Sequence, residues 1–148
     1  MSLRLDLEQT MHEAMRKKDD LTRDTLRMVF SSIKQVEVET RKSLEDQDIL
    51  SILQKEVKIR KETISELSAT ERIDLLNKAE SEIAILEKFL PAQLSDEEIT
   101  NLAKQVIKEV SASSPADMGK VMKILLPLVK GRALPDRISR IVKQILTN

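Results

Sequence analysis

The chain has 148 residues, enough for one ordinary domain or two small ones. Hydrophobic residues make up 41% and charged residues 34%, with only two glycines and two phenylalanines, and this composition is typical of an all-α protein. The formal net charge is +0 and cysteine is absent, so disulfides, thiolate catalysis and cysteine-bound metals are excluded.

Targeting and membrane signals are missing from the sequence. No apolar run approaches 18 residues, and the first ten residues, MSLRLDLEQT, lack the apolar region of a signal peptide. We therefore expect a cytoplasmic protein that does not contact membranes.

Apolar residues recur at intervals of three and four through the first 90 residues, which predicts amphipathic helices. The four apolar stripes begin at Leu7, Leu26, Leu50 and Ile73. Breaks separate them near residues 19–20, at Ser43 and at residues 69–70. Ser43 with Asp46 three residues later resembles a capping box that would start the third helix. We expect these long helices to pack as antiparallel hairpins.

The stretch FLPAQLSDEEI, residues 89–99, ends the fourth helix and starts another. Pro91 stops a helix, and Ser95 with Glu98 forms a capping box. The sequence therefore predicts a domain boundary, with an N-terminal helical domain over residues 1–91 and a small C-terminal helical domain of three helices over residues 95–148.

The middle helix of the C-terminal domain has its own start and stop signals. Ser114 and Asp117 form a further capping box, with Pro115 in the first helical position. Pro127 should kink or end the helix, because it cannot donate to the carbonyl of Lys123. A last helix follows and carries the apolar residues Ile138, Ile141, Val142 and Ile145.

Basic residues gather at the C-terminal end. From Ala112 onward the chain carries 7 Lys and Arg against 2 Asp and Glu, a net of +5. On a helical wheel Lys120, Lys123 and Lys130 fall within an arc of roughly 80°. The apolar residues of the same stretch occupy the opposite side: Val121, Met122, Ile124, Leu125, Leu128 and Val129. The lysines thus form a basic ridge on the predicted solvent side.

The two glycines lie at either end of this stretch. Gly119 borders the basic ridge inside a helix, where glycine costs about 0.5–1 kcal/mol relative to alanine. Its bare backbone suits close approach either by a phosphate backbone or by another helix. Gly131 follows the last apolar residue and is explained as a helix C-terminal residue in left-handed geometry.

Other candidate chemistry has a simpler structural explanation. The single histidine, His12, has no cysteine partners, and no nucleophile–base pair is apparent, so we predict no catalytic residue, metal or cofactor. A second basic run, KEVKIRKE at residues 55–62, is interleaved with glutamates and is interpreted as a solvated face. The lysines of the ridge admit the same interpretation. Since Tyr and Trp are absent, any RNA contact must involve phosphates and shape rather than stacked bases.

Several motifs together resemble the YqeY-like family. They are LRMVFSSIK, LQKEVKIRKE, FLPAQLSDEE, DMGKVM at residues 117–122 and KGRA at residues 130–133. The family is the stand-alone relative of the tail domain of the B subunit of tRNA-dependent aspartyl/glutamyl amidotransferase. The resemblance covers nearly the whole chain and implies a longer N-terminal and a smaller C-terminal helical part. It also implies contact with tRNA, because the related tail contacts tRNA while the amidation chemistry resides in other domains and subunits.

The chain departs from the family pattern at two places. Residues 134–136 read Leu-Pro-Asp where relatives often continue with Asp-Gly, and Phe89 stands where tyrosine is frequent.

Three functions are carried forward. The leading one is a monomeric tRNA-binding accessory module without chemistry of its own, whose nucleic-acid-binding residues are Gly119, Lys120, Lys123, Lys130, Gly131 and Arg132. The second is participation in carbon–nitrogen ligase activity with glutamine as the amido donor. The third is a helical adaptor that binds a protein partner on exposed apolar surface.

Overall fold

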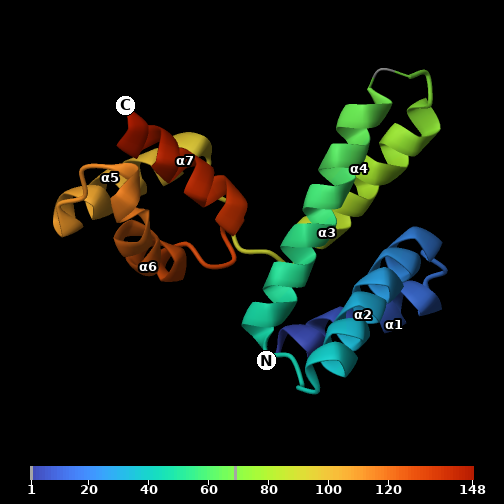
Figure 1. Cartoon of the computed structure of the whole chain (residues 1–148). Helices are drawn as coiled ribbons and strands as arrows, with labels where there is room; N and C mark the ends of the chain where they lie inside the picture. Colours follow the sequence, from blue (N-terminus) through green and yellow to red (C-terminus); the bar gives the residue numbers. More distant parts are fainter. Residues whose placement is uncertain (1, 69) are drawn as a thin grey trace. The chain divides into compact units, whose positions relative to one another are not determined.

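The computed structural model describes residues 2–68 and 70–148, and the part of the chain that it describes contains helices and no strand (Figure 1). The all-α prediction is confirmed. Of the predicted break at residues 69–70, Ala69 lies outside the described residues. The chain divides into two compact units, Met1–Pro91 and Ala92–Asn148, which are described in turn.

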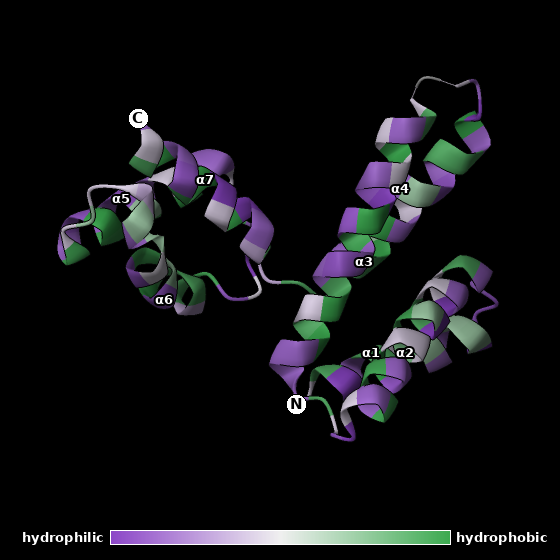
Figure 2. Ribbon diagram, viewed as in Figure 1, coloured by the Kyte–Doolittle hydropathy of each residue, from purple (hydrophilic) through white to green (hydrophobic). Residues whose placement is uncertain are grey.

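In its described residues the N-terminal unit contains four helices, α1 (Leu3–Arg16), α2 (Asp20–Thr40), α3 (Asp46–Leu67) and α4 (Ile73–Glu87). Helix α1 packs along α2 and α3 packs along α4, while α2 also contacts both α3 and α4. Apolar side chains at the centre of these contacts, among them Leu7, Leu26, Leu53 and Leu86, are completely buried. Hydrophobic and hydrophilic residues alternate around each helix in Figure 2, as amphipathic helices on a shared core require.

Two details of this unit correct the sequence analysis. Helix α3 starts with a capping box of Glu45 and Asp48, not of Ser43 and Asp46, because the helix begins at Asp46 with Glu45 as its N-cap. The Asp46 carboxylate accepts a hydrogen bond at 3.1 Å from the backbone N–H of Leu3. Ile73, assigned to an apolar stripe, is the first residue of α4 and is 65% exposed. Periodicity gives the direction of a side chain but not how far the neighbouring helix extends to cover it.

The basic run at residues 55–62 contains a buried charge. The Arg60 guanidinium contacts the carboxylate of Glu56 at 2.7 Å and that of Glu82, on α4, at 3.0 Å. The Arg60 side chain is only 8% exposed and both carboxylates are 13% exposed. Ser32 of α2 donates to Glu56 at 3.3 Å, so this network joins three helices. The interpretation of the run as a solvated face is therefore wrong at Arg60.

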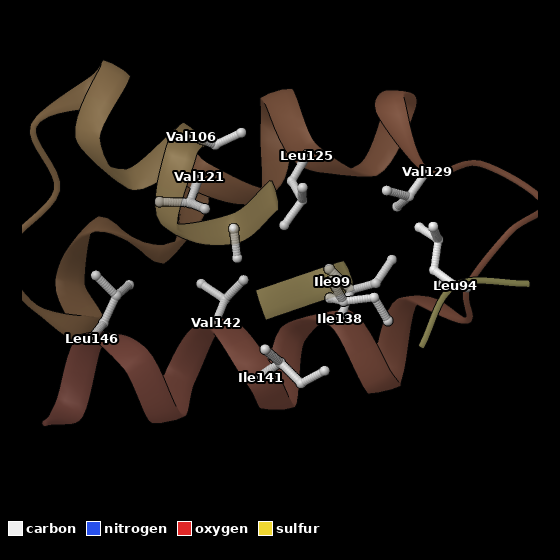
Figure 3. Close-up of a cluster of buried hydrophobic side chains, with 12 residues drawn as sticks. Leu94, Ile99, Val106, Val121, Leu125, Val129, Ile138, Ile141, Val142 and Leu146 are labelled. Atoms are coloured by element: carbon white, nitrogen blue, oxygen red, sulfur yellow. The ribbon is translucent and has the colours of Figure 1, made fainter. Parts of the chain in front are cut away.

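The C-terminal unit contains α5 (Asp96–Val110), the short 3-10 helix η1 (Pro115–Asp117), α6 (Met118–Leu128) and α7 (Pro135–Thr147). The three α-helices contact one another pairwise, and their facing side chains form one apolar core (Figure 3). Both predicted capping boxes are present: Ser95 with Glu98 starts α5, and Ser114 with Asp117 starts η1. Helix α6 ends one residue after Pro127.

Three helices end in left-handed backbone without glycine. Lys18, Arg41 and Ser111 have φ angles of 58°, 57° and 55°, and they follow or terminate α1, α2 and α5. For residues that carry a Cβ this conformation costs roughly 1–2 kcal/mol. No helix of residues 2–68 and 70–148 combines the length and the apolar composition needed to cross a bilayer.

The boundary near Pro91 predicts where a protease cuts. Pro91, Ala92 and Gln93 are exposed and non-helical, while Leu94 is buried in the C-terminal core. Limited digestion with a nonspecific protease should cleave first at residues 91–93, and the two fragments should keep their helical circular dichroism. Resistance at this joint combined with a single cooperative unfolding transition would show that the units do not fold independently.

The buried network predicts a large stability effect at Arg60. Arg60→Leu should lower the free energy of unfolding by about 3–5 kcal/mol, because it leaves two carboxylates buried without their cation. Lys55→Leu, on the exposed side of the same helix, is the control and should change stability by about 0.5 kcal/mol or less. Urea denaturation measures both, and equal effects would mean that the network contributes nothing specific.

Candidate nucleic-acid interface

The 3-10 helix η1, which leads into α6, is held by a carboxylate cap. The Asp117 carboxylate accepts hydrogen bonds from the backbone N–H groups of Ser113 at 2.9 Å and Ser114 at 3.3 Å. These bonds, with a smaller effect of the Lys120 ammonium, hold the pKa of Asp117 below its usual range. The cap therefore stabilises the fold above the ordinary pKa of aspartate, about 4, and this stabilisation is lost as the pH falls below it.

Three of the predicted site residues share the exposed side of α6. Gly119, Lys120 and Lys123 are all exposed, and the Lys120 side chain is 70% exposed. The Lys120 ammonium lies 3.8 Å from the Asp117 carboxylate, which offsets part of its charge. These residues form a compact basic surface at the first two turns of the helix.

The surroundings of Gly119 bear on the packing role proposed for it. A Cβ built at this position meets no heavy atom within 4 Å. Packing of a second helix of this chain against Gly119 is therefore not the reason for the glycine, at least among the described residues. The backbone there is open to an external ligand.

Lys130 does not continue the ridge on α6. It is exposed, but it lies in the turn between α6 and α7, two residues after the helix ends at Leu128. Pro127 lies inside the last turn of α6, where the backbone N–H of Val129 still donates to the carbonyl of Leu125 at 3.3 Å. The chain leaves the helical path after Leu128 and turns at Gly131, whose φ is 79°.

Gly131 and Arg132 build the turn rather than the ridge. Gly131 is buried with φ of 79°, the left-handed geometry predicted for it, and its carbonyl accepts a hydrogen bond from the Gln93 side chain at 2.9 Å. The Arg132 carbonyl accepts from the backbone N–H of Leu94 at 2.9 Å, and its Nε donates to the carbonyl of Ala92 at 3.2 Å. The two motifs KGRA and FLPAQL are thus two sides of one hydrogen-bonded junction, which the sequence analysis did not foresee.

The apolar side of α6 is narrower than the helical wheel indicated. Val121 and Leu125 are completely buried, but Ile124 is 39% and Leu128 is 59% exposed. Around the helix these two follow directly after Lys120 on the exposed surface. The face that α6 offers to a partner is therefore basic at one edge and apolar at the other.

Basic residues of α7 were overlooked as candidates. Arg140 and Lys143 are three positions apart and both exposed, and neither has an ion-pair partner among the described residues. Arg137, in contrast, pairs with Asp96 at 2.7 Å. The three-residue spacing of Arg140 and Lys143, within the basic C-terminal end, is the sequence signal that could have identified them as candidates.

The C-terminal unit presents cationic side chains on α6, and the remaining candidate, His12, lies elsewhere. His12 is exposed on α1, in the other unit. Within the described residues no three His, Asp or Glu side chains gather as metal ligands. The chemistry that the C-terminal unit presents is a pair of ammonium groups beside bare backbone, which suits phosphate oxygens.

Fold and surface define an all-α protein whose C-terminal three-helix unit exposes lysines on a short helix. The chain belongs to the Yqey-like protein family, whose model matches residues 4–146.

Curated relatives include "Altered inheritance of mitochondria protein 41, mitochondrial" of Kluyveromyces lactis, 33% identical over 113 residues, which is 74% of this chain and 61% of the relative. The protein of the same name from Lachancea thermotolerans is 32% identical over 115 residues, 75% of this chain and 61% of the relative. The chain thus spans about three fifths of the length of these relatives.

The names of these relatives correct the expected location. They are called mitochondrial proteins, as is the Candida glabrata relative, 32% identical over 114 residues, which are 74% of this chain and 62% of the relative. The cytoplasmic prediction is overturned by these names. It rested only on the lack of a signal-peptide region and of a long apolar run, and neither feature bears on a mitochondrial location.

The open position of Gly119 predicts that alanine stabilises the protein. Gly119→Ala should raise the free energy of unfolding by about 0.5–1 kcal/mol, because alanine is the better helix former and its Cβ meets no atom. A thermal melt measures the change. Gln105→Ala on the exposed side of α5 is the control and should shift the melting temperature little. A lower melting temperature for Gly119→Ala would mean that the position packs against protein after all.

Proposed function

We propose that the C-terminal unit binds the phosphate backbone of a structured RNA such as tRNA, and that the protein is an accessory module without chemistry of its own. The observation that carries this proposal is the exposed pair Lys120 and Lys123 beside the open backbone of Gly119. An ammonium contacts phosphate oxygens, and a residue without Cβ lets the sugar-phosphate chain approach the helix closely.

Charge supports the same assignment. Residues 92–148 carry nine Lys and Arg against six Asp and Glu, a net of +3 in a chain whose total is +0. Two to four phosphate contacts by such a surface give binding that is weak and falls steeply with salt. The resemblance to the tail of a tRNA-dependent amidotransferase agrees with this class of ligand, and association with amide-transfer chemistry would then consist of holding the RNA.

In this proposal the six predicted residues have different tasks. Lys120 and Lys123 contact phosphates, and the missing Cβ of Gly119 lets the sugar-phosphate backbone of the RNA come close to the helix. Lys130 adds charge from the following turn, while Gly131 and Arg132 hold the turn that follows α6.

A second candidate function is the protein adaptor. Exposure of Ile124 and Leu128 on α6 favours it, because apolar side chains at the surface are typical of protein interfaces.

Charge reversal on α6 tests the RNA proposal. Lys120→Glu with Lys123→Glu should reduce tRNA affinity at low salt by tenfold or more, since two attractive contacts become repulsive, and should leave the melting temperature nearly unchanged because both side chains are exposed. Fluorescence titrations at several salt concentrations measure affinity and salt slope. Single Lys→Ala variants should flatten that slope by about one unit each.

The matched control reverses the same number of charges in the N-terminal unit. Lys42→Glu with Lys55→Glu changes two exposed lysines there and should leave tRNA affinity within about twofold of wild type. An equal loss of affinity in both double variants would mean that only the net charge of the protein matters. If the wild-type protein does not bind tRNA at low salt, the proposal is wrong.

A further inference from the structure

The exposed side of α6 is not uniformly basic. In order around the helix it presents Gly119, Lys123, Pro127, Lys120, Ile124 and Leu128, all of them exposed. Lys120, Ile124 and Leu128 are four residues apart and form one line along the helix. Ile124 lies about 6 Å along the axis from Lys120, within the reach of a single nucleotide.

Aliphatic side chains gain nothing from a phosphate group. Next to a phosphate along a nucleic acid lie the ribose and the base, and only these offer an apolar face. In a paired duplex the base faces are stacked on one another, so a protein side chain reaches them only where a nucleotide is unpaired.

We propose that Ile124, Pro127 and Leu128 receive an unstacked base of the RNA whose phosphates bind Lys120 and Lys123. The RNA class is then a duplex interrupted by an unpaired nucleotide, not a uniform duplex. This inference rests on the proposed function. It names a base-contacting surface built from aliphatic residues, in a chain whose two phenylalanines, Phe30 and Phe89, pack against the N-terminal core.

The dimensions of the apolar surface favour a base over a protein helix. A helix that docks in an apolar groove uses anchors at i, i+3, i+4 and i+7, about two turns. The apolar surface on α6 extends only from Ile124 to Leu128, where the helix ends, a little more than one turn. Charge also favours a nucleic acid, because the lysines that attract phosphates lie on the same face of α6 as the apolar residues.

Two synthetic RNAs test the inference: a blunt 16-base-pair duplex, and the same duplex with one unpaired nucleotide at its centre. The wild-type protein should bind the bulged RNA about fivefold more tightly, which corresponds to burying on the order of 40 Å² of apolar surface. Ile124→Gln with Leu128→Gln should abolish this preference while leaving affinity for the blunt duplex unchanged.

Two control variants separate the inference from the proposed function. Ile73→Gln makes the same chemical change at a 65% exposed position of the N-terminal unit and should keep the preference. Lys123→Gln should weaken binding of both RNAs alike.

Equal affinity of the wild type for the two RNAs, or a preference that survives in the double glutamine variant, overturns the base contact and leaves the phosphate contacts standing. Failure of the wild type to bind either RNA overturns the proposed function and the base contact with it. If the double glutamine variant instead loses a protein partner in ribonuclease-treated extract while RNA binding is unchanged, the surface belongs to an adaptor and the inference is wrong.

Discussion

The turn that follows α6 depends on the hydrogen-bonded junction between residues 92–94 and 131–132. Three bonds of 2.9–3.2 Å connect segments that are almost forty residues apart, and two of them end on backbone carbonyls of the turn after α6. The turn needs the left-handed geometry of Gly131 to present those carbonyls. This closure fixes the path of the chain from α6 to α7, while the buried Val121 and Leu125 determine which side of α6 faces solvent.

Local signals in the sequence predicted the local structure well. The capping boxes at Ser95 and Ser114 and the helix end after Pro127 all depend on residues within four positions of one another, so they can be identified without knowing the fold. At Ser43 the same pattern failed, because α3 begins at Asp46 with Glu45 as its N-cap, and the carboxylate of Asp46 bonds to the start of α1, more than forty residues away. The capping pattern alone does not tell from which of several neighbouring polar residues a helix starts.

The errors at the candidate site have the same origin. A helical wheel placed Ile124 and Leu128 with the buried residues, but burial depends on which neighbouring helix covers them, and α5 and α7 do not extend that far around α6. Arg132 was assigned to phosphate contact as part of the KGRA motif and the basic C-terminal end, and its bond from Nε to the carbonyl of Ala92 could not be predicted because Ala92 lies forty residues away. The exposed lysines and the open glycine could be predicted because solvent exposure opposite an apolar stripe needs no distant partner.

The left-handed helix ends have a practical meaning for protein engineering. Lys18, Arg41 and Ser111 hold a conformation that glycine adopts without strain, and all three are exposed and outside both cores. Replacing them by glycine recovers part of the conformational energy stored at the ends of α1, α2 and α5. The protein can thus be stabilised at positions that are separate from α6. A variant with glycine at these three helix ends would tolerate more destabilising substitutions on the exposed face of α6.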